Sequence, residues 1–114
     1  MEIKNAQITD TFLGREDHGI MTFSICVRFY NCVHCGIGGY ALDEYDKETK
    51  TRVFCAKSME VISRILDVVG VDKWEHLKGK YIRIKDPGWG KTIDEFGNLM
   101  EDKWLNLREF FSEE

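Results

Sequence analysis

The chain has 114 residues, of which 43% are hydrophobic and 32% charged, and its formal net charge at pH 7 is −4. This length fits one domain, residues 1–114, and the hydrophobic content excludes a disordered chain. The negative charge argues against a protein that binds long nucleic acids non-specifically. Apolar runs are too short to span a bilayer and no signal-like segment opens the chain, so we expect a cytosolic protein without a membrane partner.

The first 42 residues show the two-residue periodicity of strands. Residues 3–13 place Ala6, Ile8 and Phe12 on one face and polar side chains on the other. Residues 20–30 alternate more clearly, with their apolar face formed by Met21, Phe23, Ile25, Val27 and Phe29. With residues 33–42, these segments predict a three-stranded antiparallel meander.

Three of the ten glycines, Gly36, Gly38 and Gly39, lie within four positions of the third predicted strand. Glycine is used where the backbone needs a positive φ or where another group approaches it closely. The cluster therefore predicts either a β-bulge or a site where backbone N–H groups meet a phosphate or a base. Both interpretations stay open on the sequence alone.

One amphipathic helix is predicted after a charged stretch, residues 43–50, which we expect to be a solvated loop or hairpin tip, and a brief strand, residues 51–54. Ser58 is the predicted N-cap and Gly70 the predicted left-handed C-terminal residue. The apolar residues between them recur at helical spacing: Val61, Ile62, Ile65, Leu66 and Val69. Arg64 is expected to face outward.

The segment after Gly70 predicts a short helical turn over residues 71–77, with Asp72 as its cap and Trp74 in the core. Residues 80–85 alternate again and predict a strand with Arg83 on its outward face. These features add to a mainly antiparallel β domain that carries one helix.

The last third predicts a turn at Asp86-Pro87-Gly88 and a strand over residues 92–96. A reversal at Gly97-Asn98 and a strand over residues 99–107 should follow. The remaining tail, residues 109–114, is acidic.

Catalytic and metal-binding motifs are absent from the sequence. The histidines, His18, His34 and His76, lie outside any known catalytic pattern. Cys32 and Cys35 form a C-x-x-C pair, but the other two cysteines do not form a second pair of this kind, so structural zinc is not favoured. We expect reduced thiols, no cofactor, no metal and no catalytic residue.

Arginines and aromatic side chains are the strongest indication of a ligand. Arginine forks suit phosphates, and aromatic faces such as Tyr40 and Trp104 suit purines. Trp89 stands between two glycines, so little neighbouring side-chain mass covers it. It is expected to be a base-stacking platform or an interface anchor, with a core tryptophan as the alternative.

Four stretches resemble one phage protein family. They are LGREDHGIMT (13–22), GIGGYALD (36–43), VGVDKWEHLKGK (69–80) and GNLMEDKW (97–104). These stretches are similar to the first described Thoeris anti-defence family, which sequesters cyclic ADP-ribose signals. The resemblance covers about residues 3–105. The chain departs from the family pattern at residues 32–35, where glycine, glutamine and apolar residues are more usual.

The resemblance implies a decorated immunoglobulin-like antiparallel β-sandwich that forms a homodimer or hexamer in the host cell cytoplasm. It implies a cyclic ADP-ribose isomer as ligand, held near a protomer interface and not hydrolysed; some family members also bind cyclic oligonucleotides. From side-chain chemistry and membership in these stretches, the expected ligand-binding residues are Gly36, Gly38, Gly39, Tyr40, Arg64, Arg83, Trp89 and Asn98.

Two other classes of function stay open. An acidic phage protein can inhibit a CRISPR or other defence nuclease by direct contact, with its surface imitating nucleic acid. A small interaction domain stabilised by zinc at Cys32 and Cys35 is the third reading. A bound cyclic nucleotide, a bound zinc ion or neither would separate the three.

Overall fold

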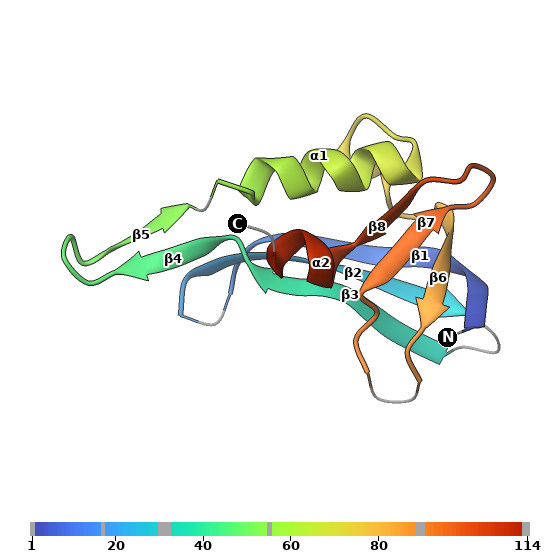
Figure 1. The fold of residues 1–114 in the computed structure, drawn as a ribbon, viewed down its shortest axis with the longest axis horizontal. Coiled ribbons are helices and arrows are strands. Elements are labelled where there is room, and N and C mark those ends of the chain that lie inside the picture. The colour runs from blue at the N-terminus through green and yellow to red at the C-terminus, as the bar shows by residue number, and fades with distance from the viewer. Residues whose placement is uncertain (1, 17, 30–32, 55, 89–90, 113–114) are drawn as a thin grey trace.

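The computed structural model describes residues 2–16, 18–29, 33–54, 56–88 and 91–112. Figure 1 shows a curved sheet with one helix across it and a hairpin that extends from one end. The elements in chain order are β1 (Glu2–Glu16), β2 (Ile20–Phe29), β3 (Val33–Ala41), β4 (Asp43–Asp46), β5 (Thr51–Phe54), α1 (Ser58–Val69), the 3₁₀ turn η1 (Trp74–His76), β6 (Tyr81–Asp86), β7 (Glu95–Asn98), β8 (Trp104–Asn106) and α2 (Leu107–Ser112). Within the described ranges, neither helix is long and apolar enough to cross a membrane.

The main sheet has six strands in the order β3-β2-β1-β6-β7-β8, and its neighbouring strands are antiparallel. The predicted fold class, mainly β and antiparallel with an amphipathic helix, is confirmed. The sheet bends until β3 meets the segment before β7, where Ile37 bridges Ile93 and the Ile93 N–H donates to the Gly36 carbonyl at 3.0 Å. Its two ends therefore face each other in a sandwich-like arrangement.

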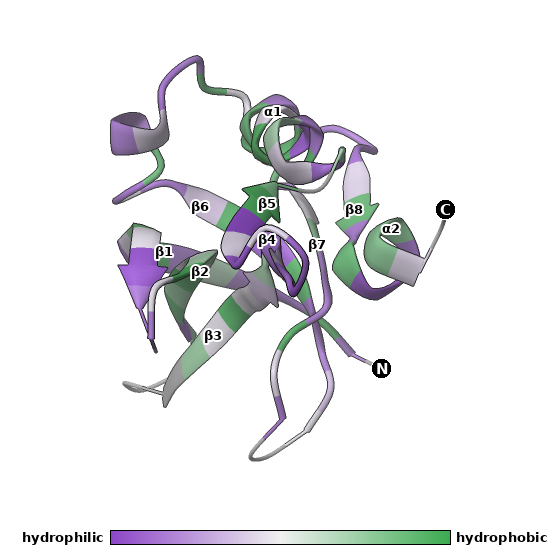
Figure 2. Cartoon of the chain, turned by 90° about the vertical axis from the view of Figure 1, so that its left-hand side faces the viewer, coloured by the Kyte–Doolittle hydropathy of each residue, from purple (hydrophilic) through white to green (hydrophobic). Residues whose placement is uncertain are grey.

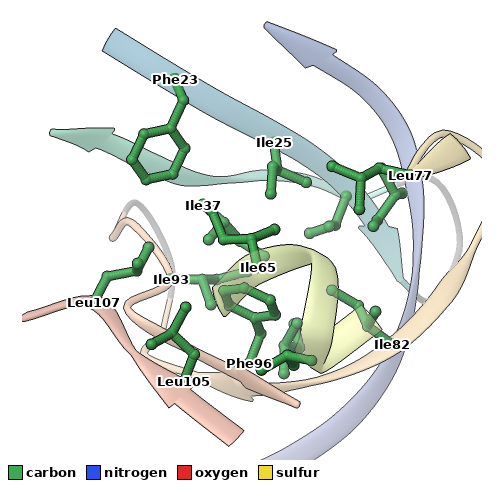
Figure 3. Close-up of a cluster of buried hydrophobic side chains, with 14 of the residues drawn as sticks. Phe23, Ile25, Ile37, Ile65, Leu77, Ile82, Ile93, Phe96, Leu105 and Leu107 are labelled. Atoms are coloured by element: carbon green, nitrogen blue, oxygen red, sulfur yellow. The ribbon is translucent and has the colours of Figure 1, made fainter. Parts of the chain in front are cut away.

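The core lies between these two ends and the apolar face of α1. Figure 3 shows strand side chains, including Phe23 and Phe96, gathered around Ile65 of α1. The three are fully buried. Trp74 is half-buried against this core and meets the Phe23 ring edge-on at 6.5 Å, as its predicted core position requires. Burial of such side chains, at about 25 cal/mol per Å² of apolar surface, is the main source of stability.

A bulge in β1 changes which side chains face the core. Ile8 pairs with Val27, but the next pair joins Asp10 to Cys26, so one extra residue lies in β1. An extra residue reverses the alternation of side chains beyond it. Ala6 and Ile8 are buried as predicted, whereas Phe12, predicted on the same face, is exposed.

The predicted C-terminal end of α1 is confirmed, whereas its predicted N-cap is wrong. Gly70 has φ 88° and ψ 37°, and its N–H donates to the Leu66 carbonyl, which confirms the left-handed C-terminal residue. Ser58 is not the N-cap. It is the first helical residue, and its hydroxyl donates to the Leu42 carbonyl at 2.6 Å, so it ties α1 to the end of β3. Asp72 is likewise not a cap, since Lys73 precedes η1 without a side-chain cap.

The predicted reversal at Gly97-Asn98 and the predicted strand over residues 99–107 are both wrong in position. Gly97 and Asn98 end β7, and the turn follows them. The Asn98 side-chain oxygen accepts hydrogen bonds from the N–H groups of Met100 and Glu101, which closes this turn. Only residues 104–106 are strand, and the tail forms α2 because Leu107 and Phe110, three residues apart, are both buried.

The charged stretch at residues 43–50 forms strand β4 and the tip of a two-stranded hairpin, β4–β5. Figure 2 shows it end-on, with hydrophilic residues on β4 and at the tip. Arg52 pairs with Asp43 at 2.8 Å, and the Met21 N–H donates to both carboxylate oxygens at 3.3 Å. The Asp43 side chain is only 4% exposed; its ion pair joins β4 to β5, and its hydrogen bonds from the Met21 N–H fix the root of the hairpin to β2.

Replacing Asp43 by asparagine should lower the melting temperature at neutral pH. The hydrogen bond from Arg52 and the Met21 N–H hold the pKa of Asp43 below its ordinary value. Stability from a lowered carboxyl pKa is present above the unfolded-state pKa, about 3.9, and disappears as pH falls through the folded-state pKa. Thermal melts followed by circular dichroism should therefore show the largest difference between wild type and Asp43→Asn near pH 7, and the difference should shrink as the pH falls below the unfolded-state pKa.

Glu44→Gln is the matched control for this measurement, because Glu44 is the next residue of β4 and is exposed. It should leave the melting curve unchanged. Equal melting temperatures for wild type and Asp43→Asn at pH 7 would contradict a structural role of the ion pair.

Candidate functional site

An aromatic ring with two cations over it lies on the outer face of the sheet. The Arg83 guanidinium carbon is 4.8 Å from the centre of the Trp104 ring, and the Lys85 Nζ is 5.4 Å from it. We call these three residues the Trp104 cluster. Arg83 pairs with Gly97 across β6–β7, and Gly97 pairs with Trp104 across β7–β8. The indole covers the glycine, since a Cβ at position 97 would lie 2.5 Å from it.

Arg83 is half-buried and its position is fixed by the turn after β7. Its Nε donates to the Asn98 carbonyl and its Nη2 to the Glu101 carbonyl, both at 2.8 Å. Among the described residues no carboxylate pairs with it, whereas Lys85 pairs with Glu95 at 3.1 Å. The carbonyls orient Arg83 without neutralising its charge, so it is the cation of the cluster that can meet an anion.

Asn98 has a structural role beside this cluster. Its side-chain N–H group donates to the Val68 carbonyl at the end of α1 at 2.9 Å, and its oxygen closes the following turn. These contacts occupy both ends of the amide. Asn98, predicted to contact ligand, therefore orders the loop that holds Arg83.

Arg64 reaches the same region from α1. Its exposed side chain pairs with Glu60 at 3.4 Å and lies over the Phe110 ring at 5.5 Å. With Trp104 and Glu95 it lines a hollow of about 190 Å³ between α1, β7, β8 and α2. The outward direction predicted for Arg64 is confirmed.

The glycine cluster forms a bulge in β3. Ser24 pairs with Gly38 and Thr22 with Ala41, so two residues of β3 lie opposite one residue of β2. Gly38 and Gly39 have φ values of 103° and 86°, and a Cβ at position 38 would lie 2.7 Å from the Phe23 ring. The bulge interpretation is confirmed. A Cβ at Gly36 would meet open space, so close approach to the backbone remains available there.

The bulge sets the position of Tyr40. Its hydroxyl donates to Asp94 at 2.9 Å, and its ring stacks on Phe111 with centres 4.6 Å apart. Burial, and then the Asp94 hydrogen bond and charge, raise the pKa of Tyr40 to about 12. Tyr40 is therefore a neutral hydrogen-bond donor at physiological pH.

The structure says less about the other residues singled out in the sequence, Trp89 and the cysteines. Trp89 and Cys32 lie outside the described residues. Cys35 is half-buried, and burial and the charge of Asp86 raise the pKa of its thiol, which disfavours the reactive thiolate. The described part of the chain holds no group of three side chains that could bind a metal ion.

The predicted residues thus lie in two groups. Arg83 lies over Trp104, Arg64 lines the hollow beside it and Asn98 orders the loop that holds Arg83, while Tyr40 and the three glycines lie on β3. Helix α2 lies between the groups, because Phe111 contacts Tyr40 and Phe110 contacts Arg64. The predicted site omits Trp104 and Lys85. Gly97 is the feature of the sequence that could have indicated Trp104, since a glycine inside a strand often lies under an aromatic ring.

Gly38→Ala should destabilise the protein by at least about 2 kcal/mol, through its positive φ and the contact with Phe23. Gly36→Ala is the control and should change stability little, because its Cβ meets open space. Urea unfolding curves measure both. Equal midpoints for the two variants would contradict the assignment of Gly38 to the bulge.

The chain has no significant match among protein-family models, curated proteins or solved structures. The geometry described above, together with the sequence resemblance, is therefore the basis for assigning a function.

Proposed function

We propose that the protein binds a cyclic ADP-ribose-type immune signal and sequesters it without hydrolysis, as an anti-defence protein in the host cell cytoplasm. The observation that carries the proposal is the Trp104 cluster, in which an indole ring lies beside a guanidinium that has no carboxylate partner among the described residues. A purine and a diphosphate are the two parts of this ligand. The Arg83 fork, held against the indole, suits the diphosphate, and the purine would stack on a separate aromatic ring, because Arg83, Lys85 and Gly97 already cover the Trp104 ring.

Sequestration needs affinity and no reaction. Arg83 would donate its free N–H groups to phosphate oxygens, while the carbonyls of Asn98 and Glu101 hold it in place. Arg64, which lines the hollow beside Trp104, is a second cation in this region. A sponge lowers the free concentration of its ligand only if it binds tightly, and nanomolar affinity corresponds to about −12 kcal/mol.

One protomer does not supply this affinity by itself. A charge-assisted hydrogen bond contributes about 1.5–3 kcal/mol and a stacked base about 1–3 kcal/mol. The hollow of about 190 Å³ is also smaller than common ligand pockets, which start at roughly 300 Å³. A second protomer that closes over the ligand would supply the missing contacts, in agreement with the homo-oligomer that the resemblance implies.

Titration with cyclic ADP-ribose isomers, followed by native mass spectrometry, tests the proposal. We expect a ligand mass on the protein and recovery of the unaltered isomer after denaturation. Recovery of ADP-ribose would show hydrolysis and contradict sequestration. A mass shift of one zinc ion would favour the interaction domain, and neither shift would favour a nuclease inhibitor.

In the same titration, Arg83→Ala and Trp89→Ala should each weaken binding at least tenfold. Arg28→Ala is the matched control for the arginine, because Arg28 lies on the same outer face, exposed and bonded only weakly to Gln7 at 3.4 Å. Since Arg83 also orders a turn, thermal melts must accompany the affinities. Unchanged affinity for Arg83→Ala would contradict the Trp104 cluster as the site, and unchanged affinity for Trp89→Ala would contradict the stacking role expected of Trp89 from the sequence.

We further propose that self-association uses the hairpin end of the molecule. Val53, Phe54 and Met59 are 50%, 65% and 74% exposed there. Phe54 and Met59 also line an apolar groove of about 430 Å³, together with Leu13. An isolated two-stranded hairpin is marginally stable in water, so a covering surface would stabilise it.

Light scattering should give a dimer or a multiple of a dimer at micromolar concentration, and Phe54→Glu should shift it toward the monomer. Tyr81→Glu, an exposed aromatic residue on the other end of the sheet, is the control. A monomeric wild type would contradict both the assembly and a shared site.

A further inference from the structure

Tyr40 has one aromatic face that is already occupied by the protein itself. Its ring and that of Phe111 are stacked, with an interplanar angle of 17° and centres 4.6 Å apart. This offset arrangement is the one that a planar nucleobase adopts on an aromatic side chain. Phe111 therefore occupies the place that a base would take on Tyr40.

Phe111 is the less firmly held of the two phenylalanines of α2. Leu107 and Phe110 anchor the helix, since they are 0% and 6% exposed. The Phe110 carbonyl also accepts a hydrogen bond from the Lys57 ammonium at 2.6 Å. Phe111 is only half-buried and precedes the last residue of α2. Its ring can leave Tyr40 while Leu107 and Phe110 stay in the core.

Tyr40, in contrast, is fixed. The Gly38–Gly39 bulge sets its backbone, and Thr22 donates a hydrogen bond to its carbonyl at 2.7 Å. Its hydroxyl donates to Asp94, which also pairs with Arg108 at 3.3 Å. A ring held at its backbone and at its hydroxyl keeps its orientation when its stacking partner is removed.

Cations surround this position. Lys57 and Arg64 lie over the Phe110 ring at 5.4 and 5.5 Å, and the Phe110 and Phe111 ring centres are 5.2 Å apart. The exposed Arg108 pairs with Asp94, which accepts the hydrogen bond of the Tyr40 hydroxyl. Arg64 and Arg108 are paired with Glu60 and Asp94, so the charge left for the phosphates of a nucleotide on Tyr40 is mainly that of Lys57, which has no carboxylate partner among the described residues.

We infer that Tyr40 is a base-stacking residue and that Phe111 is an intramolecular occupant of the same face, which the adenine ring of an incoming nucleotide displaces. The inference rests on the proposed function, of which it names the base-binding contact. A site that is closed most of the time binds with an affinity reduced by the fraction of open molecules. Phe111 therefore lowers the apparent affinity for adenine nucleotides.

The test is calorimetric titration of wild type, Phe111→Ala and Phe111→Leu with cyclic ADP-ribose and with AMP. Phe111→Ala should bind both about three- to tenfold more tightly, the range expected for loss of one competing aromatic pair. Phe111→Leu keeps apolar bulk without a stacking ring and should also gain affinity. In a Tyr40→Leu background, Phe111→Ala should bring no gain.

The outcomes separate this inference from the function on which it rests. If wild type binds cyclic ADP-ribose but both Phe111 variants, folded by thermal melt, bind equally or more weakly, the inference is overturned and sequestration stands. A gain that persists in the Tyr40→Leu background also overturns it. If no variant binds any adenine nucleotide, the proposed function fails, and the inference fails with it.

Discussion

The pairing of β1 with strands on both of its sides is the constraint on which the rest of the structure depends. Its first half pairs with β6 and its second half with β2, so one continuous strand joins the two ends of the bent sheet. The bulge after Ile8 lies where these two pairings meet. Bulges increase the local twist and bend of a strand, and this bend brings β3 to Ile93 and closes the core.

Much of the fold could be predicted because it depends on local periodicity. Residues 20–30 alternate without interruption, and the helix after residue 57 has apolar residues at helical spacing with Gly70 at its end. The bulge in β1 could not be predicted from the sequence, since its residues are ordinary strand formers. Ser58 was misassigned because its hydroxyl bonds to Leu42, sixteen residues away, and α2 was missed because its burial depends on contacts with distant elements.

The candidate site was predicted only in its parts. Arginines and aromatic residues could be named from their chemistry, but the sequence does not show that Arg83 reaches across β7 to Trp104. Nor does it show that Asn98 turns inward to support that arginine. The structure also shows how positive charge stays available locally in an acidic chain: backbone carbonyls, instead of carboxylates, hold Arg83.

The contact between Gly97 and Trp104 also bears on how the sequence can change over time. The indole lies so close that any side chain at position 97 would displace it. Displacing the ring would also free the guanidinium that rests on it. A larger residue at position 97 is therefore tolerable only together with a smaller one at position 104, so the two positions should covary among homologues and be inherited as a pair.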